Sequence, residues 1–326
     1  MDLIENYREE LKLVRKPMDR FWVFVLIIVA LAFPWFAKEH VIYTATLIFI
    51  YGVGILGQNL LIGYTGQLSL GQAGFLAIGA FTFGHLTRLG APWPLGLLLA
   101  GLMAGIFGII VGIPSLRLKG PYLAIATLGF GIAVYQVFLN SEVLSGGRMG
   151  LNIPKLKPFF GLSPHVSNYY FNLVFIIIFS ILTFNIISSY LGRTFIAIRD
   201  NDIAAEAIGV SLTRYKLLSF GISSFFTGIQ GGLYCLFIGF LEPNMFTFAE
   251  STTLFVAVII GGIASVEGSL MGAAFVILVP QLLSNYREMV PVIFGITIIF
   301  ILIFEPLGLY GRWYKIRLYF RNWPFR

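Results

Sequence analysis

Charged residues are scarce in this 326-residue chain. Asp, Glu, Lys and Arg make up only 11% of it, whereas 58% of the residues are hydrophobic and the mean hydropathy is +0.87. Soluble domains contain roughly a quarter charged residues, so the composition excludes a soluble globular protein. Apolar runs of about 20 residues recur along the chain and do not alternate in period two. We therefore predict an all-α, polytopic helical membrane bundle and not a β-barrel.

Motifs for catalysis and for metal or nucleotide binding are also lacking. The single cysteine, Cys235, excludes a disulfide framework and a cysteine metal site. The dipeptide Gly-Lys does not occur, so there is no P-loop, and His-Glu-x-x-His, Cys-x-x-Cys and Gly-x-Ser-x-Gly are absent as well. We expect no catalytic residue, no metal and no cofactor on this chain.

No charged residue falls in the middle of an expected membrane span, and acids such as Glu250 lie at span ends or in loops. Proton-coupled carriers usually keep an acid or histidine relay inside the membrane. His85 is the one candidate, and we expect it to face a loop. This pattern disfavours a stand-alone secondary transporter or channel, which remains the alternative from another class.

We predict ten membrane spans, of which the thirteen-residue run Ser251–Ile263 is short for a complete crossing. The ten are Phe21–Ala37, Val41–Gly63, Leu68–Thr87, Trp93–Ile113, Gly120–Asn140, Tyr169–Leu191, Leu217–Leu241, Ser251–Ile263, Gly268–Ser284 and Pro291–Phe304. With the N-terminus inside, 16 Lys and Arg residues are cytoplasmic and 6 are external. This bias supports ten spans with both termini cytoplasmic. The net charge of +7 then reflects topology and not nucleic-acid binding.

Both tails are typical of segments that contact membrane lipid. In residues 1–20, apolar side chains repeat at helical spacing until Pro17, which predicts an amphipathic helix along the inner leaflet. Residues 312–326 interleave aromatic with basic side chains, as a headgroup anchor does. The membrane domain would occupy 21–311.

Two glycine-rich stretches, 63–74 and 261–272, interrupt the apolar pattern at membrane depth. Glycine lowers helix stability by about 1 kcal/mol, and membranes tolerate it where backbones touch or where a helix is broken beside a cavity. Tight packing and lining of a translocation path explain the first stretch equally well. The candidate path residues are Gly66, Gln67, Ser69, Gly71, Gln72 and Gly74.

Glycines elsewhere fit packing alone, namely the pairs Gly101/Gly105, Gly108/Gly112 and Gly228/Gly232. The two interrupted stretches lie five spans apart, an odd offset that reverses orientation. This suggests an inverted repeat of spans two to five and seven to ten.

A polar insert, residues 192–216, lies between two long apolar runs. We predict a short helix over Ile203–Ile208, with Asp202 as N-cap and Gly209 as the residue that ends it. Such a helix is about 9 Å long, which suits docking to a partner better than simple connection.

Several motifs together resemble one family, the permease subunits of branched-chain amino acid ABC importers in their LivM-like branch. They are GQNLLIGYTGQLSLGQAGFLAIGA (57–80), GIPSLRLKGPYLAIATLGFG (112–131), SGGRMGLNIP (145–154), GRTFIAIRDNDIAAEAIGVSLTRYKLLSF (192–220), GFLEPNMFTF (239–248) and GGIASVEGSLMGA (261–273). The resemblance implies a bacterial or archaeal plasma-membrane protein that pairs with a homologous, LivH-like permease. It also implies two cytoplasmic ATPase subunits, which hold the ATP and Mg, and an extracytoplasmic solute-binding protein.

The resemblance also gives the 192–216 insert a role, transmission of ATPase closure to the membrane. Many related permeases carry Glu-Ala-Ala, three residues, then Gly; here Ala204, Ala205 and Gly209 fit, but Ile203 replaces the Glu. The coupling residues so implied are Arg199, Asp200, Asp202, Ala204, Ala205, Glu206, Gly209 and Arg214. Similar permeases serve urea, short amides and aromatic acids, and an uncharged path suits these as well as a branched-chain amino acid.

Overall fold

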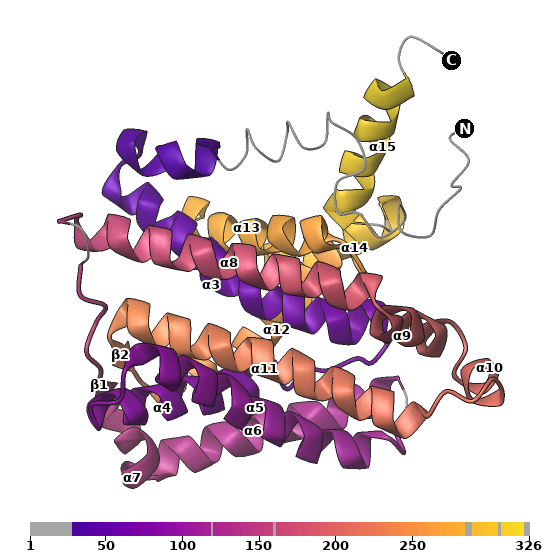
Figure 1. The fold of residues 1–326 in the computed structure, drawn as a ribbon, viewed down its shortest axis with the longest axis horizontal. Coiled ribbons are helices and arrows are strands. Elements are labelled where there is room, and N and C mark those ends of the chain that lie inside the picture. The colour runs from indigo at the N-terminus through magenta and orange to yellow at the C-terminus, as the bar shows by residue number, and fades with distance from the viewer. Residues whose placement is uncertain (1–27, 119, 159–160, 284–288, 306–307, 323–326) are drawn as a thin grey trace.

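The computed structural model describes residues 28–118, 120–158, 161–283, 289–305 and 308–322. The amphipathic helix expected over 1–20 lies outside them, as does the start of the first expected span, of which residues 28–36 are helical. The long helices run side by side along the longest axis of the molecule (Figure 1).

Helices dominate the described residues. In chain order they are α3 (Glu39–Asn59), the π-helix η1 (Leu60–Tyr64), α4 (Gln72–Arg88), α5 (Trp93–Ser115), α6 (Pro121–Asn140), α7 (Glu142–Ser145), η2 (Gly147–Met149), α8 (Pro164–Ser188), α9 (Tyr190–Asp200), α10 (Asp202–Ala207), α11 (Leu212–Ile238), η3 (Pro243–Phe246), α12 (Phe248–Gly261), α13 (Val266–Leu282), α14 (Val290–Phe304) and α15 (Gly308–Asn322). Two-residue strands β1 (Leu151–Asn152) and β2 (Phe240–Leu241) pair antiparallel, with Leu151 opposite Leu241.

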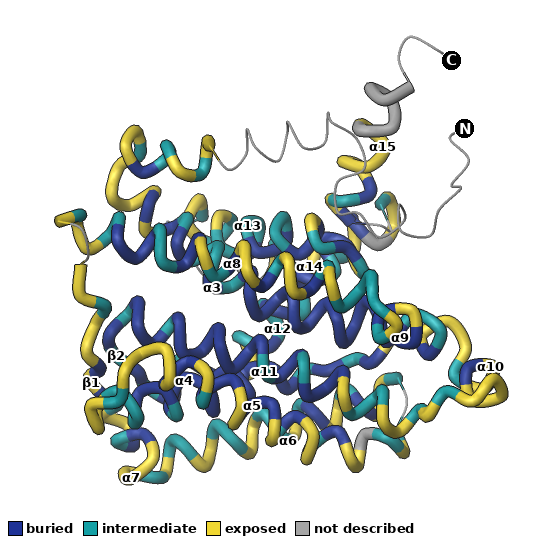
Figure 2. Tube along the Cα trace, viewed as in Figure 1, coloured by how far each residue is buried: buried dark blue, intermediate teal, exposed yellow. Residues whose placement is uncertain are grey.

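Helices α3 and α11 form the centre of the bundle. α11 packs against α5, α4 and α3, while α3 packs against α8 and α13, and α12 packs against α13. Burial follows this arrangement, because the central helices are mostly buried, whereas only Leu123 and Thr127 of α6 and Ala205 of α10 are buried (Figure 2).

Glycines let α11 approach α5 closely. A Cβ on Gly228 would lie 2.5 Å from the Ala104 Cβ and 2.7 Å from the Ala100 carbonyl oxygen, both on α5. A Cβ on Gly101 would lie 2.7 Å from the Phe225 ring on α11. The other members of the three glycine pairs also face a neighbouring helix. The packing role predicted for these pairs is therefore confirmed.

Six helices of the described residues are long and apolar enough to cross a membrane, so the protein is a multi-pass membrane protein. They are Glu39–Tyr64, Trp93–Pro114, Pro121–Asn140, Pro164–Ser188, Leu212–Ile238 and Pro243–Gly261. Two shorter apolar helices are Val266–Leu282 and Val292–Ile301. The expected short span at 251–263 gains length because η3 precedes α12. The expected third span begins at Gln72 and not at Leu68.

Helix α15 begins at Gly308, four residues before the tail expected at 312–326, and runs across the direction of the long helices (Figure 1). Glu305 holds it through ion pairs of 3.1 Å to the Arg312 Nε and 3.0 Å to the Lys315 Nζ.

Candidate coupling and translocation site

The short helix predicted in the 192–216 insert is α10, which projects with α9 at one end of the bundle (Figure 1). The sequence predicted Asp202 as its N-cap, but the N-cap is Asn201. The backbone of Asn201 is extended, and its Oδ1 accepts from the Ala204 N–H at 3.0 Å. Asp202 is the first helical residue, where its negative charge favours the helix N-terminus.

Gly209 ends α10, as predicted, through a Schellman motif. Its φ of +89° is left-handed backbone, which glycine adopts without steric cost. The Gly209 N–H donates to the Glu206 carbonyl at 2.9 Å, and the Val210 N–H donates to the Ala205 carbonyl at 3.0 Å. These two bonds fix the shape of the turn without any partner.

The two faces of α10 differ. Ala205 is buried against the chain itself, whereas Ala204 and Glu206 are exposed. Ile203 and Ile208 are 74% and 79% exposed. The helix thus presents two exposed isoleucines, beside the exposed Glu206, to whatever lies beyond the bundle.

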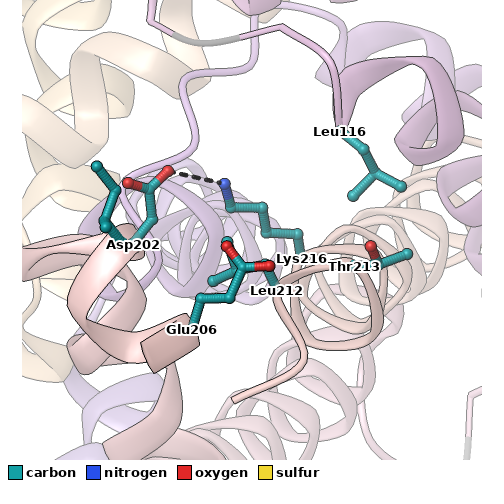
Figure 3. Close-up of a pocket in the computed structure, with 7 residues that line it drawn as sticks. Leu116, Asp202, Glu206, Leu212, Thr213 and Lys216 are labelled. Atoms are coloured by element: carbon teal, nitrogen blue, oxygen red, sulfur yellow. Dashed lines mark ion pairs between the residues drawn. The ribbon is translucent and has the colours of Figure 1, made fainter. Parts of the chain in front are cut away.

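An ion pair ties α10 to α11. The Lys216 Nζ lies 3.5 Å from the Asp202 Oδ2, and both side chains are largely buried. They line a pocket of about 210 Å³ with Glu206, Leu212 and Thr213 (Figure 3). Of the remaining predicted coupling residues, Arg214 is exposed, and Asp200 is 61% exposed.

Arg199 does not face outward with α10; it reaches the first helix break, the non-helical residues Thr65–Gly71. The Gln67 N–H, which would donate to the Gly63 carbonyl in a continuous α-helix, donates instead to the Leu61 carbonyl at 3.1 Å. The Arg199 Nη1 donates to the Gly63 carbonyl at 3.0 Å in its place. A charged donor therefore satisfies a carbonyl that the helix end leaves free.

One pocket joins the predicted path residues to the predicted coupling residues. Its volume is about 370 Å³, and Gly66 and Gln67 line it together with Arg199, Asp200 and Asp202. Two segments more than 130 residues apart in the sequence thus meet at one place. Neither the spacing of the glycines nor the charge pattern of the insert predicted that they would.

The polar side chains among the path candidates nevertheless find partners inside the chain. The Gln67 Nε2 donates to the Ser219 Oγ at 2.6 Å, and the Gln72 Nε2 donates to the Ser223 Oγ at 3.2 Å. Ser69 and Gln72 are fully buried. Gly71 and Gly74 lie against α6, where a Cβ on Gly74 would be 3.0 Å from the Phe130 ring. These contacts favour the packing interpretation for 69–74.

The second helix break, Gly262–Ser265 between α12 and α13, is held by a residue that the sequence did not single out. The Asn59 Nδ2 donates to the Ser265 carbonyl at 2.9 Å and to the Ser269 Oγ at 2.8 Å. Its Oδ1 accepts from the Ala264 N–H at 2.9 Å. An amide at the end of an apolar helix was the available signal, because such a side chain is expensive to bury unless it has partners.

Glu250 was expected at a span end, and it does lie in the first turn of α12. Its side chain nevertheless turns inward, where its carboxyl group lies beside Tyr51 of α3 and Tyr234 of α11. Those two rings contact each other edge to face, with centroids 6.3 Å apart. His85 is at the opposite end from α10, with its Nε2 2.6 Å from the Leu144 carbonyl oxygen.

Comparison with known proteins agrees with this arrangement. Residues 40–304 match the family described as branched-chain amino acid transport system / permease component. The chain belongs to this permease family. No solved structure matches the chain significantly.

Several curated relatives cover most of the chain, and two illustrate their range. The chain is 34% identical over 317 residues to the high-affinity branched-chain amino acid transport system permease protein LivM of Escherichia coli, covering 89% of this chain and 75% of the relative. The fructose import permease protein FrcC of Rhizobium meliloti is 30% identical to this chain over 269 residues, which cover 78% of this chain and 73% of FrcC. Permeases named for quite different solutes are thus similar to this chain.

Proposed function

We propose that this chain is the transmembrane permease subunit of an ATP-binding-cassette importer of the bacterial or archaeal inner membrane. It forms the translocation path for leucine, isoleucine and valine together with a homologous, LivH-like permease. Two cytoplasmic ATPase subunits, which bind ATP and Mg, drive it, and an extracytoplasmic solute-binding protein delivers the substrate.

The outer surface of α10 is the observation that carries this proposal. A stable, capped helix with two exposed isoleucines lies on a hydrophilic insert at the end of a membrane bundle. Exposed apolar surface beside charged residues marks a protein interface. Burying two isoleucines contributes up to roughly 3–6 kcal/mol before the cost of association, so they would anchor an ATPase groove to this end of the permease together with further contacts.

The orientation and the span count belong to the same proposal. Ten spans place α10 and both termini in the cytoplasm, with the α7–β1 loop outside. The helix contacts support the inverted repeat, because α3 packs against α13 of the second half and α11 packs against α5 of the first. In the proposed repeat α3 corresponds to α11 and α5 corresponds to α13, so the α3–α13 contact and the α11–α5 contact are equivalent.

Branched-chain amino acids are the proposed substrates because two relatives that each cover 89% of this chain carry that name. The alternative is the same architecture importing urea, short amides or another small solute, and the similarity to FrcC keeps it open. A stand-alone transporter or channel is the alternative from another class. One feature favours a stand-alone transporter: the buried Oε1 of Glu250 has no hydrogen-bond partner among the residues that the structure describes.

Reconstitution with the partner subunits tests the proposal. The double variant Ile203→Ser, Ile208→Ser should lose co-purification of the ATPases and lose ATP-driven leucine uptake in proteoliposomes. Leu89→Ser is the matched control, because Leu89 is 83% exposed at the opposite end of the molecule. Uptake that survives ATP depletion but collapses with a protonophore would refute the importer assignment. Binding of urea, acetamide or fructose to the assembled importer, with no binding of leucine, would show that the proposed substrate is wrong.

A further inference from the structure

Gly63 is the point at which three parts of the molecule meet. Its carbonyl accepts a hydrogen bond from Arg199, which lies in the last turn of α9, shortly before α10 begins. A Cβ on Gly63 would lie 2.9 Å from the Ala264 Cα in the second break and would also collide with the Ala264 N and the Asn59 Oδ1. Backbone therefore touches backbone here, and a shift of one segment displaces the other.

Asn59 secures this contact from one turn away. Asn59 and Gly63 are four residues apart, so they share a face at the end of α3 and η1. Asn59 is 2% exposed and bonds within the second break, to Ala264, and in the first turn of α13 beyond it, to Ser269. The second break is thereby fastened to the same helix end that Arg199 grips.

Ala264 shows that this fastening holds an unfavourable backbone. Its φ is +59°, and it is the one non-glycine residue with positive φ in the part of the chain that the structure describes. L-residues avoid this region because the Cβ approaches the carbonyl oxygen. The bond from its N–H to Asn59 helps to keep that conformation, and strained backbone of this kind clusters at functional and switch regions.

We propose that Arg199 and Asn59 are positioning residues that link the 192–216 insert to both helix breaks, so that movement of α10 shifts the two breaks together. This rests on the proposed function, since the movement comes from the ATPases. Arg199 acts on the first break through the Gly63 carbonyl. Asn59 passes the displacement to the second break through Ala264 and Ser269.

The test compares uptake with ATP hydrolysis in the assembled importer. Asn59→Ala and Arg199→Ala should each assemble and hydrolyse ATP, while leucine taken up per ATP falls about tenfold. Because the two residues act in series, the double variant should be no worse than the poorer single variant. Thr46→Val is the control, since Thr46 is fully buried on α3 and its hydroxyl donates to the Ile42 carbonyl of its own helix.

Milder variants decide the matter where Asn59→Ala fails to assemble. Ser269→Ala removes one partner of Asn59, and Arg199→Lys keeps the charge but changes the reach to Gly63; each should lower uptake per ATP by several-fold. Wild-type uptake per ATP in these variants would overturn the proposal, as would additive losses in the double variant. A wild-type protein that shows no ATP-driven uptake would instead refute the proposed function.

Discussion

Gly71→Ala is the substitution that best separates packing from path lining in the 63–74 stretch. Gly71 is the residue before α4 and faces the backbone of α6 at Thr127. An added Cβ would be closer than 3.0 Å to the Thr127 carbonyl oxygen and 3.3 Å from the Thr127 Cβ, whereas ordinary contacts are 3.4–4 Å. Its φ of −99° suits alanine, so the whole effect comes from this collision.

The expected size follows from that geometry. α6 must move away by at least about 0.5 Å, and one methyl group forced into a packed contact typically costs about 1–3 kcal/mol. The movement also strains the bond from the Leu70 N–H to the Thr127 Oγ1, which is 3.0 Å long. For a protein of this size we expect the melting temperature to fall by roughly 2–6 °C.

Thermal unfolding of the purified protein measures this loss, and Gly129→Ala is the matched control. Gly129 lies on the same helix α6, no atom is within 4 Å of its added Cβ, and it should gain up to about 1 kcal/mol from helix propensity. If Gly71→Ala melts at the wild-type temperature yet loses uptake, then the packing interpretation is wrong and the stretch lines the path.

Three further predictions concern the surface of the protein. In a Cys235→Ala background, cysteine at Met149 or Ser163 should label from outside and cysteine at Ser211 only from the cytoplasm; external labelling at Ser211 would reverse the orientation. Gly209→Pro cannot adopt a φ of +89° and should stop uptake and ATPase stimulation in a folded permease, while Gly90→Ala, also at positive φ but at the other end, should leave both intact. Hydrogen bonds from Lys315 and Arg312 lower the pKa of Glu305, so its contribution to holding α15 is complete above its unfolded pKa and is lost as pH falls through its folded pKa. Glu305→Gln should make proteolysis of the tail at neutral pH as fast as in acid, and unchanged proteolysis would disprove this anchor.

The sequence predicted the local features of the insert more successfully than their surroundings. The short helix and its glycine terminus follow from residue preferences over a few positions, so α10 and Gly209 could be found. Asn201 and Asp202 are both good N-caps, and local preference alone does not choose between them. Ala205 was expected to face a partner, but its burial depends on how α9 and α11 fold around it.

Contacts between distant segments could not be predicted from one sequence. In the sequence, Arg199 does not differ from the other arginines of the insert; only the structure shows that the π-helix at Leu60–Tyr64 leaves the Gly63 carbonyl free for it. Gln67 and Gln72 are equally suited to a polar path and to a bond between helices, and only the position of α11 shows that Ser219 and Ser223 meet them. Site roles for these residues remain predictions for that reason.

Helices of the first half pack against helices of the second half, α5 against α11 and α3 against α13, and this has a consequence for biosynthesis. α5 is complete at residue 115, but its main partner α11 begins at residue 212. Roughly a hundred residues must therefore be inserted before the glycine contacts between α5 and α11 can form. Until then the glycines of α5 that face α11 lack the helix they pack against and remain available to other membrane proteins. Chains that stop before α11 should be substrates of membrane quality control, and the protein should resist division into separately expressed halves.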